Sequence, residues 1–243
     1  MVRPLGWIAA GGLGVGVVFL SLAYVTGGND MRRLVDLGLT FGRSSCDGNG
    51  ATASERRLAW NGGDTISIAV PSTVHYRGDS GDEVIVRGPP DVVAHVEIRG
   101  GRIVLDCYPG GSRTVDITLP GRVFHHISLS GSGKVLMENV SQPDLSVTIS
   151  GSGTLRAQGN VERATITISG SGDARLGDLA VKQLTVKVSG SGDIEAAPKE
   201  LADIKLSGSG TVRLLTRPAQ LRSHIAGSGR IIQPQVEAAD VKK

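Results

Sequence analysis

The protein has 243 residues, of which 35 are glycine, with 3% aromatic residues and two cysteines. This composition predicts repeated turns and a core of aliphatic side chains, in one or two domains. The formal net charge of +3 is spread over interleaved acidic and basic residues, so it gives no reason to expect nucleic-acid binding.

Residues 1–26 form a candidate membrane segment. Residues 5–25 carry no charged side chain, and a helix of about 20 apolar residues spans a bilayer. Ser21 and Ala23 could also serve as the small residues of a signal-peptidase site. The segment is therefore a transmembrane anchor or a secretory signal helix, and its length favours the anchor. Either interpretation predicts that the rest of the chain is translocated.

Residues 27–53 are rich in glycine, serine, asparagine and arginine and are interpreted as a linker. A β-domain follows over residues 54–232, and its first part, residues 54–123, is interpreted as an irregular β entry. Alternating apolar residues predict short half-buried strands there, and no window shows a helical period. The positions expected to face inward are Ile66, Ile68, Val70, Val84, Val86, Ala94, Val96, Ile98, Ile103, Leu105, Cys107, Val115, Ile117 and Leu119.

A four-residue motif organises residues 124–232. Ser-Gly-Ser-Gly recurs every 18–20 residues, beginning at Ser130, Ser150, Ser169, Ser189 and Ser207, with Ala-Gly-Ser-Gly at Ala226. Such a period indicates a repeat architecture in which each unit stacks on its neighbours. Because a strand, a crossover helix and a return strand need roughly 30 residues, the repeats predict a parallel β-solenoid.

The residues around the motif predict which side chains face the core. The position before the first serine is apolar in every copy, from Leu129 to Ile225, and the position before that is polar. The alternation resumes after the motif, so each repeat has a strand on either side of a glycine-rich corner. Stacked corners would align the second serines into a column that can exchange hydroxyl hydrogen bonds: Ser132, Ser152, Ser171, Ser191, Ser209 and Ser228. Residues 233–243 are interpreted as a polar tail.

The repeats have a further feature in common with a known family. They follow the segment Trp60-Asn61-Gly62-Gly63-Asp64 and the strand Ile66-Ser67-Ile68-Ala69-Val70-Pro71. Over about residues 58–232 the chain resembles the bacterial proteins described as "putative auto-transporter adhesin, head GIN domain". The resemblance implies a right-handed β-helix on or within the bacterial envelope and a non-enzymatic binding role. It supplies no catalytic residues.

Catalytic and metal sites are disfavoured by the residue pattern. Asp173 and Asp193 follow the motif as in calcium-binding β-rolls, but the equivalent residues of the other copies carry no carboxylate: Lys134, Thr154, Thr211 and Arg230. His125 and His126 are adjacent and would face opposite sides of a strand. No spacing of histidine, cysteine and carboxylate resembles a zinc or iron site. We therefore predict no catalytic residue, metal or cofactor.

The outward positions after the motif offer a candidate binding surface. Arg156, Arg175 and Arg213 occupy equivalent positions and could form a basic stripe for an anionic glycan or lipid, which Glu195 interrupts. An ordinary solvated surface is the simpler interpretation. No aromatic residue follows Phe124, so the aromatic platforms typical of sugar-binding proteins are not expected in the repeats.

The sequence thus predicts an envelope protein that is anchored in the inner membrane with its β-domain in the periplasm, or exported. Its role would be that of an adhesin or binding surface for an unknown envelope protein or glycan. The alternatives are a polysaccharide-active β-helix enzyme and a structural or regulatory envelope module.

Cys46 and Cys107 could form one disulfide in an oxidising compartment, or they could be unlinked thiols, because sequence alone gives no Cα separation.

Overall fold

The computed structural model describes residues 45–46, 52–78, 80–107 and 113–235. Every described residue belongs to one unit, Ser44–Lys243. The predicted membrane segment and most of the predicted linker and tail therefore lie outside the described residues. Within the described part of the chain, no helix has both the length and the apolar character needed to cross a membrane.

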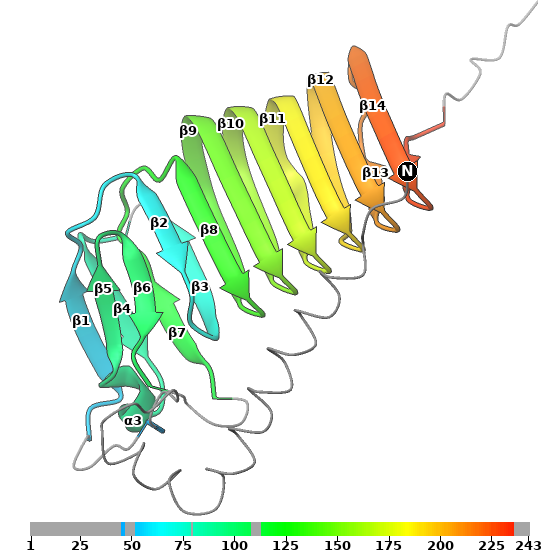
Figure 1. The fold of residues 1–243 in the computed structure, drawn as a ribbon. Helices are drawn as coiled ribbons and strands as arrows, with labels where there is room; N and C mark the ends of the chain where they lie inside the picture. Colours follow the sequence, from blue (N-terminus) through cyan, green and yellow to red (C-terminus); the bar gives the residue numbers. More distant parts are fainter. Residues whose placement is uncertain (1–44, 47–51, 79, 108–112, 236–243) are drawn as a thin grey trace, which may run out of the picture. The chain divides into compact units, whose positions relative to one another are not determined.

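The repeats form a stack of coils in which each coil pairs with the next in parallel register (Figure 1). This arrangement confirms the all-β, solenoid-like fold that the period of the motif predicts. Several strands run around most of a coil, because a single hydrogen-bonded ladder continues past the bend. The strands of the stack are β8 (His126–Gly131), β9 (Lys134–Gly151), β10 (Thr154–Gly170), β11 (Asp173–Gly190), β12 (Ile194–Gly208), β13 (Thr211–Leu214), β14 (Gln220–Gly227) and β15 (Arg230–Ile232).

The core lies inside the coils and follows the predicted alternation. The residues before the first serine are at most 2% exposed in the first five copies: Leu129, Ile149, Ile168, Val188 and Leu206. The sixth residue of this set, Ile225, is 40% exposed, so its predicted place in the core is wrong. Within the described residues β14 pairs with β12 alone, and no further coil covers its apolar side chains.

The coils differ in length at the corner opposite the motif. The pairing of β11 with β12 shifts register between Leu176 and Ala180 and again between Val181 and Gln183. The pairing of β10 with β11 shifts between Arg156 and Gly159. Such β-bulges absorb extra residues without disturbing the strands on either side. The period of the motif can therefore vary while the motif itself stays in register.

The part of the same hydrogen-bonded sheet that precedes the stack contains both parallel and antiparallel pairs and is called the mixed sheet. Its strands are β1 (Glu55–Ala59), β2 (Thr65–Ile68), β3 (Ser72–Arg77), β4 (Glu83–Arg87), β5 (Val96–Arg99), β6 (Arg102–Leu105) and β7 (Val115–Thr118). β2 and β3 pair in parallel with β8 and β9 and so form a first coil. In contrast, β4 pairs antiparallel with β1 and β7, and β5 pairs antiparallel with β6.

One short helix, α3 (Pro90–Val93), interrupts this mixed sheet, although the sequence pattern predicts none. Pro90 lies at the start of the helix, where a proline has no hydrogen bond to lose and its fixed φ suits the first turn. Val92 and Val93 are buried, whereas Ala94, expected to face the core, ends the helix and is exposed. A four-residue helix is shorter than any periodicity window can detect.

Long-range contacts hold the mixed sheet together. Cys46 and Cys107 form a disulfide with a Cα–Cα distance of 5.0 Å, and both side chains are buried. The predicted linker therefore contributes Cys46 to the folded unit. Phe124 packs edge-on against Trp60 and Tyr76, with ring centroids 5.4 Å and 6.0 Å apart, so the aromatic contacts gather where the mixed sheet meets the stack.

Candidate functional site

The Ser-Gly-Ser-Gly motif forms the corner at which each coil turns. The first glycine has a positive φ in every copy, from 94° at Gly131 to 131° at Gly190. From Gly151 onward, a Cβ on this glycine would overlap the carbonyl oxygen of the matching glycine in the preceding coil. Glycine is therefore required by both the backbone conformation and the close stacking of the coils, which assigns the motif a structural role.

The second serine of each motif is exposed to solvent, at Ser132, Ser152, Ser171, Ser191, Ser209 and Ser228. The backbone N–H groups of Ser152 and Ser171 donate to the first-glycine carbonyls of the preceding coils, each at 3.0 Å. Among the described residues, no hydrogen bond joins two of the serine hydroxyls, in contrast to the expected ladder. The backbone thus holds the corners together, and the hydroxyl groups remain available on the surface.

The predicted basic stripe is present as a row of paired positions. Arg156 lies opposite Arg175, Arg175 opposite Glu195, and Glu195 opposite Arg213 in the parallel ladders. Their side chains point away from the core, because the residues on either side of each are buried. Glu195 therefore interrupts the stripe, as the sequence alignment indicates.

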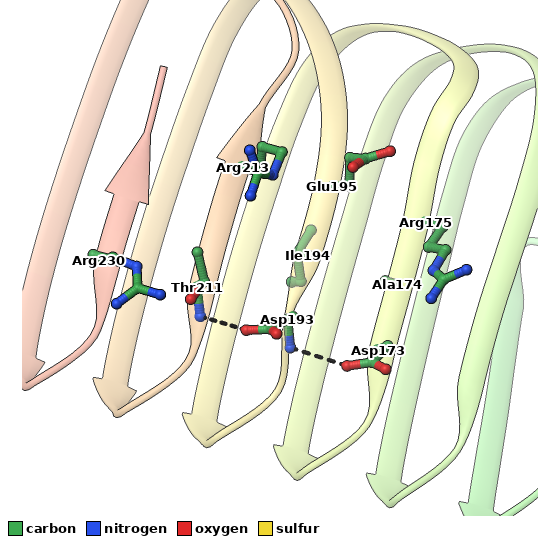
Figure 2. Close-up of a pocket in the computed structure, with 9 residues that line it drawn as sticks. All are labelled: Asp173, Ala174, Arg175, Asp193, Ile194, Glu195, Thr211, Arg213 and Arg230. Atoms are coloured by element: carbon green, nitrogen blue, oxygen red, sulfur yellow. Dashed lines mark hydrogen bonds between the residues drawn. The ribbon is translucent and has the colours of Figure 1, made fainter. Parts of the chain in front are cut away.

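A depression of about 270 Å³ lies along this row, and Figure 2 shows the side chains that surround it. Arg175, Glu195 and Arg213 line one side, and a second row that ends in Arg230 lines the other. The second row begins with Asp173, followed by Asp193 and Thr211 on successive coils. Aligning the repeats of the sequence did not group Arg230 with the other arginines, because Arg230 lies two positions closer to the motif than they do.

Asp173 and Asp193 act as backbone acceptors between coils. The N–H of Asp193 donates to Asp173 Oδ1 at 3.3 Å, and the N–H of Thr211 donates to Asp193 Oδ1 at 2.8 Å (Figure 2). In the earlier coils, the matching N–H groups of Thr154 and Asp173 donate to glycine carbonyls at 3.0 Å. The two carboxylates thus replace carbonyl oxygens as acceptors on the outer edge of the corner.

The arginines of the depression differ from Arg156 and Arg163, the two arginines of the stack that make ion pairs within the described residues. Within the described residues, the guanidinium groups of Arg175, Arg213 and Arg230 make no ion pair within 4.0 Å. By comparison, Arg163 donates two hydrogen bonds to Asp144, at 2.6 Å and 2.7 Å. This pairing, mainly through its hydrogen bonds, lowers the pKa of the Asp144 carboxyl. The depression therefore holds three arginines that make no ion pair within the described chain, beside the carboxylates of Asp173, Asp193 and Glu195.

The two adjacent histidines lie elsewhere, beside Asp144. His125 precedes β8 rather than lying within it, and its N–H and that of His126 both donate to the carbonyl of Asp64. Both residues border one surface depression that Asp144 and Arg163 also line. The expectation assumed that the two histidines lie together on one strand, whereas only His126 belongs to β8. His125 Nδ1 lies 3.3 Å from the carbonyl oxygen of Asp144.

A second cluster of polar groups surrounds the disulfide. His95 Nδ1 lies 2.9 Å from Asp106 Oδ1. One ligand-type atom from each of His95, Asp106 and Cys107 lies within 4.8 Å of the others. Sequence spacing missed this cluster, because hairpin pairing and the disulfide, rather than a short motif, bring its members together.

The comparisons with known proteins agree with the fold. Residues 110–218 match the sequence profile of the family "Putative auto-transporter adhesin, head GIN domain". This match confirms the family resemblance over the part of the chain that runs from β7 to β13. The adhesin family indicates a protein of the bacterial cell surface or envelope. No curated protein matches the sequence.

Solved structures provide fold-level similarity. A crystal structure of a "putative adhesin" from Bacteroides fragilis superposes with a TM-score of 0.59 at 18% identity, covering 74% of this chain and 96% of that one. A "putative adhesin" from Parabacteroides merdae gives a TM-score of 0.46 at 15% identity, covering 79% and 100%. A "Putative lipid binding protein" from Parabacteroides distasonis gives 0.46 at 16% identity, also covering 79% and 100%. At 18% identity, the likeness to the Bacteroides fragilis structure concerns the fold alone.

Proposed function

We propose that the protein is a non-enzymatic binding protein of the bacterial envelope, and that its solenoid binds an anionic polysaccharide. The observation that carries this proposal is the set of Arg175, Arg213 and Arg230, which make no ion pair within the described chain and border one depression. Stacking of the coils supports the proposal, because it holds the backbone positions of these arginines at fixed spacing, so that only their side chains must be ordered on binding.

The spacing of the charges favours a particular kind of polymer. Arg175 and Arg213 lie on coils two steps apart, which corresponds to about 10 Å at the usual distance between neighbouring strands. Glu195 lies between them and would repel an anionic group placed there. We therefore expect the surface to prefer a glycan that carries an anionic group on alternate sugars over one that carries it on every sugar.

Binding of the full-length protein to soluble polysaccharides tests this proposal. Hyaluronan, with one carboxylate per disaccharide, is compared with polygalacturonate and with uncharged dextran. Because each exposed ion pair contributes at most about 1 kcal/mol, R175Q/R213Q should weaken hyaluronan binding about 5- to 10-fold. Binding should also weaken with added salt, since exposed charges are screened.

The matched control is R77Q/R163Q, which removes the same charge from two exposed arginines already paired with Glu138 and Asp144. It should leave the affinity within about twofold, because neither guanidinium borders the depression around Arg213. Equal losses in the two variants would show that only net charge matters, and tighter binding of dextran than of either anionic polymer would contradict the proposal.

The alternative is a polysaccharide-active enzyme in which the carboxylates of the depression catalyse glycan cleavage. Against it, we infer that Asp173 and Asp193 serve as structural acceptors, since each accepts a backbone N–H from the next coil. D173A/D193A/E195A should therefore leave any measured glycan cleavage unchanged. Loss of turnover in a variant that keeps its far-ultraviolet circular dichroism spectrum would instead favour a polysaccharide-active enzyme.

We further propose that residues 1–26 form the membrane anchor, that the β-unit lies in the periplasm or is exported, and that the coils are right-handed. The anchor interpretation rests on the uncharged run of residues 5–25. Mass spectrometry of the native protein from fractionated cells reads the N-terminus and the compartment together. A mature chain that begins at Tyr24 would instead identify a cleaved signal peptide.

A crosslinking pull-down with no reproducible partner would favour the structural or regulatory module.

A further inference from the structure

The region around the disulfide combines four side chains of the kinds that bind zinc. Cys46 and Cys107 are joined through their sulfur atoms, and the His95 and Asp106 side chains lie beside Cys107. The cysteines are buried, whereas His95 and Asp106 keep 33% and 41% of their side-chain surface exposed. The cluster therefore has a buried half that can exclude water and an open half through which an ion can enter.

The backbone holds His95 and Asp106 in place. β5 and β6 form an antiparallel pair that ends with Val96 opposite Leu105. The next residues outward are His95 and Asp106, and the N–H of Asp106 donates to the carbonyl of His95 at 3.4 Å. The two side chains are thus neighbours across the hairpin, and Cys107 follows directly along the chain.

We propose that reduction of the disulfide turns this cluster into a zinc site, with Cys46 Sγ, Cys107 Sγ, one ring nitrogen of His95 and one carboxylate oxygen of Asp106 as ligands. Tetrahedral zinc with usual bond lengths separates neighbouring ligand atoms by about 3.3–3.8 Å. The atoms of His95, Asp106 and Cys107 already lie within 4.8 Å of one another. Cys46 is outside this group of three and is held next to it by its bond to Cys107, so its side chain would turn towards the other ligands once that bond is broken.

The chemistry requires a thiol or phosphine reductant and releases protons. A dithiol reductant is oxidised to its own disulfide while the bond between Cys46 and Cys107 takes up two electrons and two protons. Zinc then displaces the two thiol protons and binds the thiolates. The oxidised form has no thiolate to offer, so the cluster would bind zinc in one redox state only. This inference is independent of the arginine depression, which lies in the repeats.

Zinc titration of the full-length protein tests the proposal, with an oxidised sample and a sample reduced by an excess of a phosphine, which becomes the phosphine oxide. The reduced protein should bind one zinc ion per chain, at least about 100-fold more tightly than the oxidised protein. Cobalt(II) added in place of zinc should give the visible bands of a tetrahedral site and thiolate-to-metal charge-transfer absorption.

Substitutions identify the ligands. H95A and D106A should each weaken zinc binding by the reduced protein at least about tenfold, which is the order seen when one group of a metal site is lost. H224A, which removes an exposed histidine from β14, is the matched control and should change nothing. C46S/C107S should abolish the cobalt charge-transfer band while His95 and Asp106 remain.

The proposal is overturned if the reduced protein binds zinc no more tightly than the oxidised protein, or if H95A and D106A both leave the affinity unchanged. It is also overturned if H224A weakens binding as much as H95A, since binding would then be distributed over surface histidines. Because His95 and Asp106 are partly exposed, their substitutions should leave the fold intact, and circular dichroism of each reduced variant checks this.

Discussion

The mixed sheet from β1 to β7 and the stack from β8 to β15 both enclose aliphatic side chains between β-strands, but they do so by different means. In the stack, parallel in-register pairing places like residues on like residues from coil to coil. The mixed sheet instead has three antiparallel strand pairs, one disulfide and two aromatic contacts of Phe124, none of which is repeated along the chain. In the stack, every repeat must meet the same steric requirement. The mixed sheet depends instead on individual contacts between residues that are distant in the sequence.

The largest effect should come from the first glycine of the motif. Gly190→Ala should destabilise the protein by about 4 kcal/mol, because the new Cβ adopts a disfavoured φ of 131° and overlaps the carbonyl oxygen of Gly170. At Gly131 the φ is also positive, but a Cβ would meet no atom within 4 Å. Gly131→Ala should therefore cost only about 1–2 kcal/mol.

Urea denaturation of the two variants measures this difference. Both substitutions fall at the same place in the motif and at a positive φ, 94° for Gly131 and 131° for Gly190, but only Gly190 stacks closely on a preceding glycine corner. Equal losses of unfolding free energy would mean that the backbone conformation alone requires glycine at this position. Close stacking on the preceding corner would then add nothing to the requirement.

The next effect compares the middle of the stack with its end. Ile166 is fully buried in β10, whereas Ile225 in β14 is 40% exposed. Ile166→Ala should cost about 3 kcal/mol, because it opens a cavity that packed neighbours cannot close. Ile225→Ala should cost less than about 1 kcal/mol. Thermal and urea unfolding measure both, and a large loss at Ile225 would indicate that another surface covers the last coil in solution.

A smaller effect should follow from the carboxylate acceptors. Asp193→Ala leaves the N–H of Thr211 without its acceptor at 2.8 Å and should cost about 1 kcal/mol. Asp193→Asn keeps a side-chain oxygen there and should cost about half as much. Hydrogen exchange of the Thr211 amide, followed by NMR, should be fastest in the alanine variant. Equally slow exchange in all three proteins would show that the carboxylate is dispensable.

The smallest effect concerns one ion pair between neighbouring coils. Arg163 lowers the pKa of the Asp144 carboxyl below its ordinary value of 3.8, so R163Q should raise this pKa towards that value. A carboxyl whose pKa is lowered by folding stabilises the protein above its ordinary pKa, and this contribution disappears as the pH falls through the lowered pKa.

Carbon-13 NMR of the Asp144 side chain measures the shift directly. The stabilities of wild type and R163Q should differ slightly at neutral pH and converge in acid. A titration of Asp144 that is the same in both proteins would show that the pair is not formed in solution. Because the pair joins residues that face each other in β9 and β10, the test also reports on the register of the coils.

The amino-acid sequence determined the coil by itself. The period of the motif, the inward parity of residues such as Ile149 and Ile168, and the glycine corner could all be predicted. Each depends on a local pattern that stacking repeats at every step. The in-register row of Arg156, Arg175 and Glu195 followed from the same alignment, because equal places in a repeat become neighbours in space.

The tertiary structure alone decided the features that occur once. It paired Cys46 with Cys107 across 61 residues, brought His95 beside Asp106, and left Ile225 exposed at the end of the stack. It also decided which arginines have a carboxylate partner, since Arg163 meets Asp144 whereas Arg213 meets none within the described chain. These outcomes depend on contacts between distant or terminal residues, for which a local period carries no information.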